Sequence, residues 1–398
     1  MNPSASGWID KYFSRLKHKL PLNASEDEFY KALREKGFVY GHVLRPGGVD
    51  AGLSKGWTAE EITKTALLDA LYEAFRLQTD TEDPTEFVQK ALDFYHQMAP
   101  EGFSILKKVL PASPAAHELE DILDERVQTN DNIISRNFSH ILTNALLFMD
   151  VLAFMQFLHH EELPAKYLKK LEETVVSIIA LALQSKSKKT EYDNLLIKLF
   201  ESSVRYTKFS EMKEGDLDKL ELSYFGSVAE RSYLLDMAGM AIWSDGAADK
   251  AELDFLYRLA HQLHIDDEAA AESIATFDVF IKLNKKDIPY FKYSNPVKHF
   301  YDHAAQTVML LINRNKNRLI KELGNNGELM LLLTHSTHRT LDVSEKKKIR
   351  KQLLEICKTI PSLTIFLLPG GSLLLPLLIK FIPQLLPSVF NENLEENE

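Results

Sequence analysis

Residues 360–390 read IPSLTIFLLPGGSLLLPLLIKFIPQLLPSVF, and Lys380 is the only charged side chain among them. No other stretch of the chain is so long, so apolar and so nearly uncharged. An apolar run of about 20 residues is long enough to cross the hydrocarbon core of a bilayer as a helix. Prolines and a glycine pair interrupt this run, and membrane helices tolerate such interruptions better than soluble helices do, because neighbouring helices or water satisfy the freed backbone groups. The run therefore predicts a hydrophobic membrane segment.

The prolines allow more than one arrangement of this segment. Pro369, Pro376 and Pro383 are spaced seven residues apart, so they would lie along one stripe of a continuous helix. The break at Gly370-Gly371 leaves a piece of only about ten residues before it, which is short for a simple span. A re-entrant hairpin is thus as well founded as a single crossing. A buried C-terminal hairpin of a soluble protein is the non-membrane alternative.

A basic helix is expected directly before the apolar run. Residues 344–359 read SEKKKIRKQLLEICKT, in which Ile349, Leu353 and Ile356 have helical spacing. Basic residues that flank a hydrophobic segment favour the cytoplasmic side and attract anionic headgroups, whereas the acidic tail 391–398 does not decide the orientation. The headgroup-facing residues predicted here are Lys346, Lys347, Lys348, Arg350 and Lys351. For the basic cluster alone, the alternative is a solvated helix face.

These motifs resemble the membrane segment of the LETM-like family, which are leucine-zipper, EF-hand-containing transmembrane proteins and their bacterial relatives. The resemblance covers residues of about 313–391 and is densest after residue 344. The residues that carry it are Pro361, then Pro369-Gly370-Gly371-Ser372-Leu-Leu-Leu-Pro376, then Lys380-Phe-Ile-Pro383-Gln-Leu-Leu-Pro387-Ser388-Val-Phe390. It implies a bacterial inner-membrane protein with most of the chain on the cytoplasmic face.

Two departures limit what the resemblance implies. Ser372 stands where the family usually carries a glutamate, the kind of intramembrane carboxylate that binds a cation or relays a proton. Its absence argues against proton-coupled cation exchange. Larger family members also continue into a soluble domain linked to ribosome binding, whereas this sequence carries eight residues after Phe390. Ribosome tethering is therefore expected by analogy alone.

Most of the remaining sequence has the apolar periodicity of helices. Helices are predicted over residues 58–78, 84–98, 115–127, 137–158, 163–183 and 192–206. The stretch 138–158 is apolar, but Asp150 within it would be costly in a bilayer, so a buried helix of a soluble bundle is preferred over a second span. The fold class expected is all-α, a multi-helix bundle.

A second resemblance lies within residues 233–270. Asp245-Gly246 ends one helix, and Asp249 with Glu252 forms a capping box that starts the next. This helix–DG–helix pattern resembles the TerB-like module of tellurite-resistance proteins. That resemblance implies that Asp245, Asp249 and Glu252 bind a divalent cation, although helix capping accounts for the same residues. No other cofactor is indicated.

The composition of the chain and the absence of certain motifs restrict the classes of function that it can have. The chain is 45% hydrophobic and 26% charged, which is typical of a folded protein. Its net charge of −10 argues against a general nucleic-acid binder, so DNA is not an expected partner. The sequence lacks phosphate-binding glycine loops, an H-E-x-x-H pair and a nucleophile elbow, and we expect no enzyme. Cys357 is the only cysteine, which rules out an intramolecular disulfide.

These observations predict five regions and three functions. The regions are an N-terminal helical domain (1–210), a TerB-like module (211–312), a LETM-like basic region (313–359), the hydrophobic segment (360–390) and the acidic tail (391–398). The first function is a non-enzymatic scaffold anchored in the membrane by contact with lipid. The alternatives are K⁺/H⁺- or Ca²⁺/H⁺-type cation homeostasis through a homo-oligomeric C-terminal segment, and a membrane tether for ribosomes.

Overall fold

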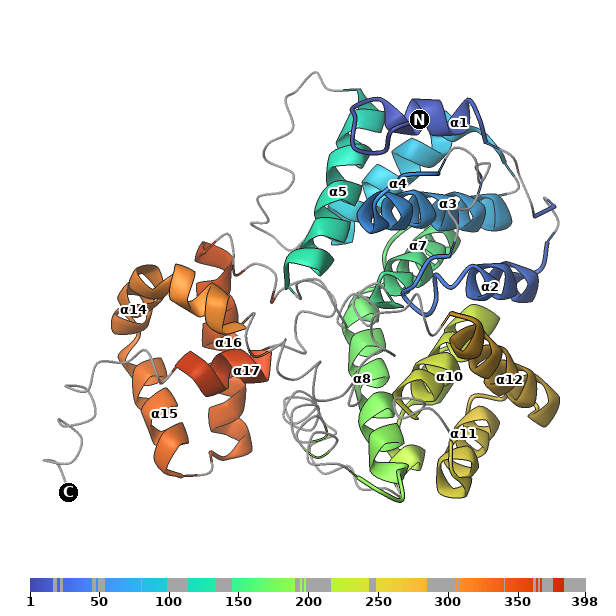
Figure 1. Ribbon diagram of the computed structural model, residues 1–398. Coiled ribbons are helices and arrows are strands. Elements are labelled where there is room, and N and C mark those ends of the chain that lie inside the picture. Colours follow the sequence, from blue (N-terminus) through green and yellow to red (C-terminus); the bar gives the residue numbers. More distant parts are fainter. Residues whose placement is uncertain are drawn as a thin grey trace, which may run out of the picture.

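The chain folds into helices, which confirms the all-α prediction (Figure 1). The computed structural model describes residues 1–16, 20–21, 24–44, 48, 54–79, 81–98, 114–133, 145–189, 194, 197, 216–242, 248–284, 305, 308–339, 341–360, 363, 366 and 375–382, and no strand occurs among them. The first helices are α1 (Trp8–Phe13), α2 (Glu26–Glu35), α3 (Ala59–Thr79), α4 (Pro84–Met98), α5 (Ala115–Ile133), α7 (Phe148–His160) and α8 (Tyr167–Ser185). They are followed by two short 3₁₀ turns (Asp216–Lys219 and Leu222–Tyr224), α10 (Val228–Ile242), α11 (Lys250–Gln262), α12 (Asp267–Asn284), α14 (Lys316–Gly324), α15 (Gly327–His338), α16 (Val343–Thr359) and α17 (Leu375–Phe381).

The predicted helices 58–78, 84–98 and 163–183 correspond closely to α3, α4 and α8. The helix predicted over 115–127 continues to Ile133 as α5, and α7 begins at Phe148 within the predicted helix 137–158. Most of residues 192–206 lie outside the described part of the chain. Periodicity thus located the helices whose apolar faces are in the core.

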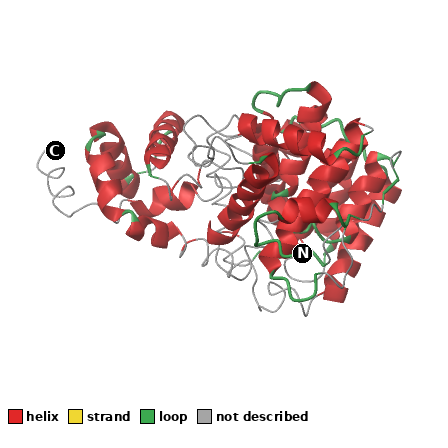
Figure 2. Cartoon of the chain, turned by 90° about the horizontal axis from the view of Figure 1, so that it is seen from above, coloured by secondary structure: helices red, strands yellow, loops and turns green. Residues whose placement is uncertain are grey.

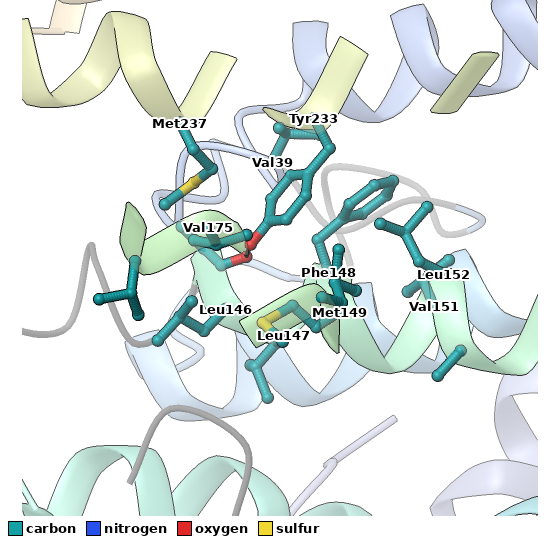
Figure 3. Packing of buried hydrophobic residues seen from close by; sticks show 14 of the residues in the cluster. Val39, Leu146, Leu147, Phe148, Met149, Val151, Leu152, Val175, Tyr233 and Met237 are labelled. Atoms are coloured by element: carbon teal, nitrogen blue, oxygen red, sulfur yellow. Dashed lines mark hydrogen bonds between the residues drawn. The ribbon is translucent and has the colours of Figure 1, made fainter. Parts of the chain in front are cut away.

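Helices α1 to α12 form the larger body of the molecule (Figure 1). Within it α3 packs against α5 and α7, while α10 packs against α2, α8 and α12. Figure 3 shows one meeting point of this core, where Tyr233 of α10 lies beside Phe148 of α7, Val175 of α8 and Val39, which follows α2. The Tyr233 hydroxyl donates a hydrogen bond to the Ala145 carbonyl at 3.1 Å, so the buried phenol is satisfied.

Charged side chains on α3 are buried, and several are paired within the core. Asp69 accepts hydrogen bonds from the Tyr12 hydroxyl at 2.7 Å and from the Lys36 ammonium at 3.0 Å. Arg76 donates to Glu73 at 2.7 Å. Burial is the largest cause that raises the pKa of Tyr12 well above its usual value, and the neighbouring Asp69 adds to it. These contacts explain how α3 can lie in the interior despite its charges.

Asp150 is fully buried in α7, where Arg126 of α5 supplies its counter-charge. The guanidinium donates two hydrogen bonds to the carboxylate, from Nε at 2.8 Å and from Nη2 at 2.7 Å. The Tyr95 hydroxyl donates a third at 3.3 Å. A buried carboxylate is tolerated only when it is paired in this way. The structure therefore places α7 in a bundle, as the charge within its sequence indicated.

A second buried carboxylate, Asp236 of α10, joins three helices. It accepts hydrogen bonds from the Tyr30 hydroxyl of α2, at 2.5 Å, and from the Ser273 hydroxyl of α12. The Arg34 guanidinium of α2 lies 3.9 Å away. Burial raises the pKa of Asp236, and these partners partly offset that effect by favouring the carboxylate. The contact ties α2 to the helices near the middle of the sequence.

Helices α14 to α17 gather beside this body, at the left of Figure 1, and the view in Figure 2 also separates them from it. We call residues 308–382 the C-terminal unit. Helix α15 packs against both α14 and α16. The side chains that fill the interior of the unit are apolar and almost completely buried: Val308, Ile312, Leu319, Leu323, Leu329, Leu333, Ile349, Leu353 and Cys357.

The described part of the apolar run is folded into the interior of the protein. Ile360, Leu363, Phe366, Leu375, Leu377, Leu378 and Ile382 are each at most 1% exposed. Helix α17 has seven residues, far fewer than the roughly 20 that cross a bilayer. Among the described residues, no helix combines the length and apolar character that a membrane crossing requires. The described residues therefore do not support the predicted membrane segment.

The rate at which the Cys357 thiol reacts with a reagent in solution tests whether this interior is closed to solvent. Cys357 is the only cysteine of the chain, it is buried on α16, and burial raises the pKa of its thiol to about 12. Because the thiolate is the reactive form, we expect native protein at pH 8 to react with a thiol-specific chromogenic disulfide at least 100-fold more slowly than unfolded protein does. Labelling in buffer without detergent, with and without urea, measures this ratio. Equal rates would contradict the buried position of α16.

Candidate functional site: a basic helix in the C-terminal unit

Helix α16 begins at a well-defined cap. The Asp342 carboxylate accepts a hydrogen bond from the backbone N–H of Glu345 at 2.8 Å, and the Glu345 carboxylate accepts one from the Asp342 N–H at 2.9 Å. Arg339 donates two further hydrogen bonds to Glu345, at 2.6 and 2.9 Å. The hydrogen bonds from Arg339, and then that from Asp342, lower the pKa of Glu345 to about 2. Both oxygens of the Glu345 carboxylate therefore accept hydrogen bonds that stabilise the start of α16.

The two sides of α16 differ sharply in chemistry. Ile349, Leu353 and Ile356 lie on the buried side, together with Cys357. Lys347, Lys348 and Lys351 are exposed, while Lys346 and Arg350 are half-buried at the margins. Burial of the apolar side chains fixes the rotation of α16 about its axis, and this rotation directs the lysines toward solvent. This exposure fits both a solvated helix face and the predicted headgroup-facing cluster, so the headgroup contact stays a prediction.

Only some of these cations are neutralised. The Lys348 ammonium donates to Glu328 at 2.8 Å, and the Gln352 amide donates to the same carboxylate at 3.0 Å. The hydrogen bond and charge of Glu328 raise the pKa of Lys348. Within the part of the chain that the structure describes, Lys347 and Lys351 have no carboxylate partner. They remain available to an anionic partner.

The charge of the C-terminal unit is opposite to that of the chain as a whole. Residues 308–382 hold twelve Lys or Arg and five Asp or Glu, a net charge of +7. The whole chain has a net charge of −10, so the remainder carries −17. The unit is therefore a local basic body on an acidic protein, and the overall charge does not describe the surface that α16 presents.

Of the residues predicted for the membrane segment, two are in the described part of the chain. Lys380 is exposed on α17, and its ammonium lies 5.7 Å from the centre of the Phe381 ring. Pro376 lies in the first turn of α17, where a proline is tolerated because the missing N–H has no helical partner. The others lie outside the described residues: Pro361, Pro369, Gly370, Gly371, Ser372, Pro383, Pro387 and Phe390.

Two of the three residues predicted as metal ligands, Asp249 and Glu252, form a helix cap in the structure. The Asp249 carboxylate accepts a hydrogen bond from the Glu252 N–H at 3.0 Å, and Glu252 accepts one from the Asp249 N–H at 2.6 Å. Hydrogen bonds from Ser187, and then from Glu252, lower the pKa of Asp249. Asp245 lies outside the described residues, among which no group of three potential ligands is found. Divalent-cation binding here stays a prediction.

The sequence analysis missed a second row of cations. Arg314, Lys316, Arg318 and Lys321 are all exposed, on α14 and the helical turn before it. The signal was present, since residues 314–321 contain these four cations and no acidic residue.

Comparison with known proteins supports one of the two resemblances. Residues 341–398 match the model of a family described as LETM1-like, RBD. This match supports a LETM-like relationship for the segment that begins just before α16. No comparison supports a TerB-like module. Neither the curated proteins nor the solved structures contain a match to this chain.

Proposed function

We propose that this protein is a non-enzymatic, LETM-like ribosome-binding protein whose exposed α16 lysines contact ribosomal RNA. The observation that carries the proposal is the pair Lys347 and Lys351, exposed and unpaired within the described residues, in a unit of net charge +7. Lysines that neutralise phosphates release condensed counterions, which supplies affinity without any need for base contacts. The description of the matching family model, LETM1-like, RBD, and the link of larger LETM-like proteins to ribosomes support the same partner.

The distribution of charge is compatible with this role. A uniformly acidic protein would be repelled by RNA, but fields decay within about 8 Å at physiological ionic strength. A partner that touches α16 therefore experiences mainly the basic unit. The acidic remainder limits non-specific adhesion, which favours one defined orientation on the ribosome.

Replacing Lys346, Lys347 and Lys351 by glutamine is expected to reduce ribosome binding about tenfold or more. Each lost lysine–phosphate contact removes about 0.7–0.9 from the slope of log affinity against log salt, so the slope should become flatter by about 2 to 3. Sedimentation of purified ribosomes through a sucrose cushion at several salt concentrations measures both quantities.

The matched control removes three charges from the body instead, with Lys11, Arg15 and Arg258 replaced by glutamine. These side chains are exposed on or beside α1 and on α11. The control variant should pellet with ribosomes as the unmodified protein does. Equal pelleting of the α16 variant and the unmodified protein would show that these lysines do not bind the ribosome.

A membrane-anchored scaffold at the cytoplasmic face of the bacterial inner membrane is the second candidate. The sequence of residues 360–390 favours it, and so do the basic side chains that precede this run, because anionic headgroups attract lysines as phosphates do. Flotation of the protein with vesicles that contain anionic lipid distinguishes the candidates. Flotation together with a failure to pellet with ribosomes would select the membrane. Cation transport is not proposed, because Ser372 lacks the carboxylate that this chemistry requires.

A further inference from the structure

We infer that α14 forms a second phosphate-binding surface, which holds the backbone of double-helical RNA next to the surface of α16. The inference rests on the proposed function, since it assumes that ribosomal RNA is the partner. It adds a set of contact residues outside the segment that matches the LETM-like family model. Those residues are Arg314, Lys316, Arg318 and Lys321.

The fold directs these cations outward. Leu319 and Leu323 of α14 are completely buried and hold one side of the helix against its neighbours. Arg318 and Lys321 are exposed on the other side of the helix. From Lys316 to Lys321 the helix rises about 7.5 Å, so its cations are spread along one side of α14.

The four cations differ in ion pairing from several other cations of the C-terminal unit. Within the described residues none of the four forms an ion pair, although Glu322 is one helical turn after Arg318. Some exposed cations elsewhere in the C-terminal unit do have carboxylate partners, as Arg339 does with Glu345 and Lys358 with Glu355. An unpaired row of like charges is costly to keep together unless a polyanion binds there.

The C-terminal end of α14 lies close to α16, because α15 packs against both helices. Helix α14 ends at Gly324, and a short turn leads directly to Glu328 at the start of α15. Glu328 accepts hydrogen bonds from Lys348 and Gln352 of α16. The end of α14 is therefore brought next to the lysine-bearing part of α16, so one stretch of nucleic acid can contact both.

The side chains between the cations favour RNA over lipid. Asn313, Asn317 and Asn325 are exposed, and their amides can donate hydrogen bonds to phosphate and ribose oxygens. A helix that lies on a membrane instead presents large apolar side chains to the acyl boundary. The exposed residues of α14 include none of this kind, although Leu310, one helical turn before Arg314, is 49% exposed.

The test measures binding of the full-length protein to a fluorescent 20-base-pair RNA duplex by anisotropy. Replacing Arg314, Lys316, Arg318 and Lys321 by glutamine is expected to weaken binding about tenfold or more. The salt slope should become flatter by about one for each residue that touches a phosphate. The matched control replaces Lys11, Arg15, Lys250 and Arg258, which are exposed on the body, and should bind within about twofold of the unmodified protein.

A charge-conserving variant and the α16 glutamine variant described above distinguish failure of this inference from failure of the proposed function. A variant with Arg314→Lys and Arg318→Lys keeps the charge and should retain binding, whereas loss of binding in it would indicate damage to the fold and overturn the charge-based account. If the α14 glutamine variant binds the duplex normally while the α16 variant does not, this inference is wrong and the proposed function stands. If the unmodified protein binds neither duplex nor ribosome, both fail. Binding to anionic vesicles but not to the duplex would also overturn the inference.

Discussion

Replacing Asp150 by alanine is expected to lower the free energy of unfolding by about 3–5 kcal/mol, because it leaves the Arg126 guanidinium buried without its counter-charge. Both side chains are almost completely inaccessible, and the pair is joined by two hydrogen bonds of 2.7 and 2.8 Å. Urea denaturation followed by circular dichroism measures the change.

The control for this experiment is an exposed ion pair on α16. Lys358 donates to Glu355 at 2.8 Å, but both side chains are largely in water. Replacing Glu355 by alanine should therefore change the free energy of unfolding by no more than about 0.5 kcal/mol. A double variant with leucine at 150 and methionine at 126 should recover much of the stability, because it removes both charges together. An Asp150→Ala variant as stable as the control would show that the carboxylate is not buried with Arg126.

The second large effect is expected at Leu378, which is completely buried on α17. Replacing it by alanine leaves a cavity and should destabilise the C-terminal unit by about 2–5 kcal/mol. The opening of the unit exposes Cys357, so its rate of labelling without detergent should rise by about 30-fold or more, given that about 1.4 kcal/mol corresponds to a factor of ten. Labelling kinetics at pH 8 measure the change.

Leu331 supplies the matched control, since the same substitution there removes a side chain that is 43% exposed on α15. Its labelling rate should stay within about threefold of that of the unmodified protein. If the segment that contains Leu378 lies instead in lipid or in water, the Leu378→Ala substitution creates no cavity. Labelling of Cys357 would then be fast already in the unmodified protein, or unaffected by the substitution.

The elements that sequence could predict are those with a local physical signal. The apolar spacing of α3 and the capping box of Asp249 with Glu252 each depend on residues within a few helical turns. Asp150 indicated a buried helix through the cost of its charge. Its partner Arg126 was not predictable, because 24 residues separate the two and only the packing of α5 on α7 brings them together.

The C-terminal run shows where a local signal does not decide the structure. Hydrophobicity measures the preference of a side chain to leave water, and lipid and a protein interior satisfy that preference equally. The chain contains apolar surfaces on α14, α15 and α16 that can cover residues such as Leu363 and Leu378, but periodicity alone does not reveal that they meet. Of the basic residues predicted to face headgroups, Lys347, Lys348 and Lys351 are exposed on α16. Whether headgroups or RNA phosphates bind them depends on what the adjoining run does.

The central claim is that the lysines of α16 lie against ribosomal RNA, and photo-cross-linking from these positions tests it most directly. A diazirine-bearing lysine analogue would replace Lys347 or Lys351 in turn, with Arg258 on the body as the reference position. Irradiation of the protein bound to ribosomes should give ribonuclease-sensitive adducts with ribosomal RNA from positions 347 and 351, and none from position 258. Adducts absent from both α16 positions while ribosome binding persists, or formed only with lipid in membrane preparations, would contradict the account.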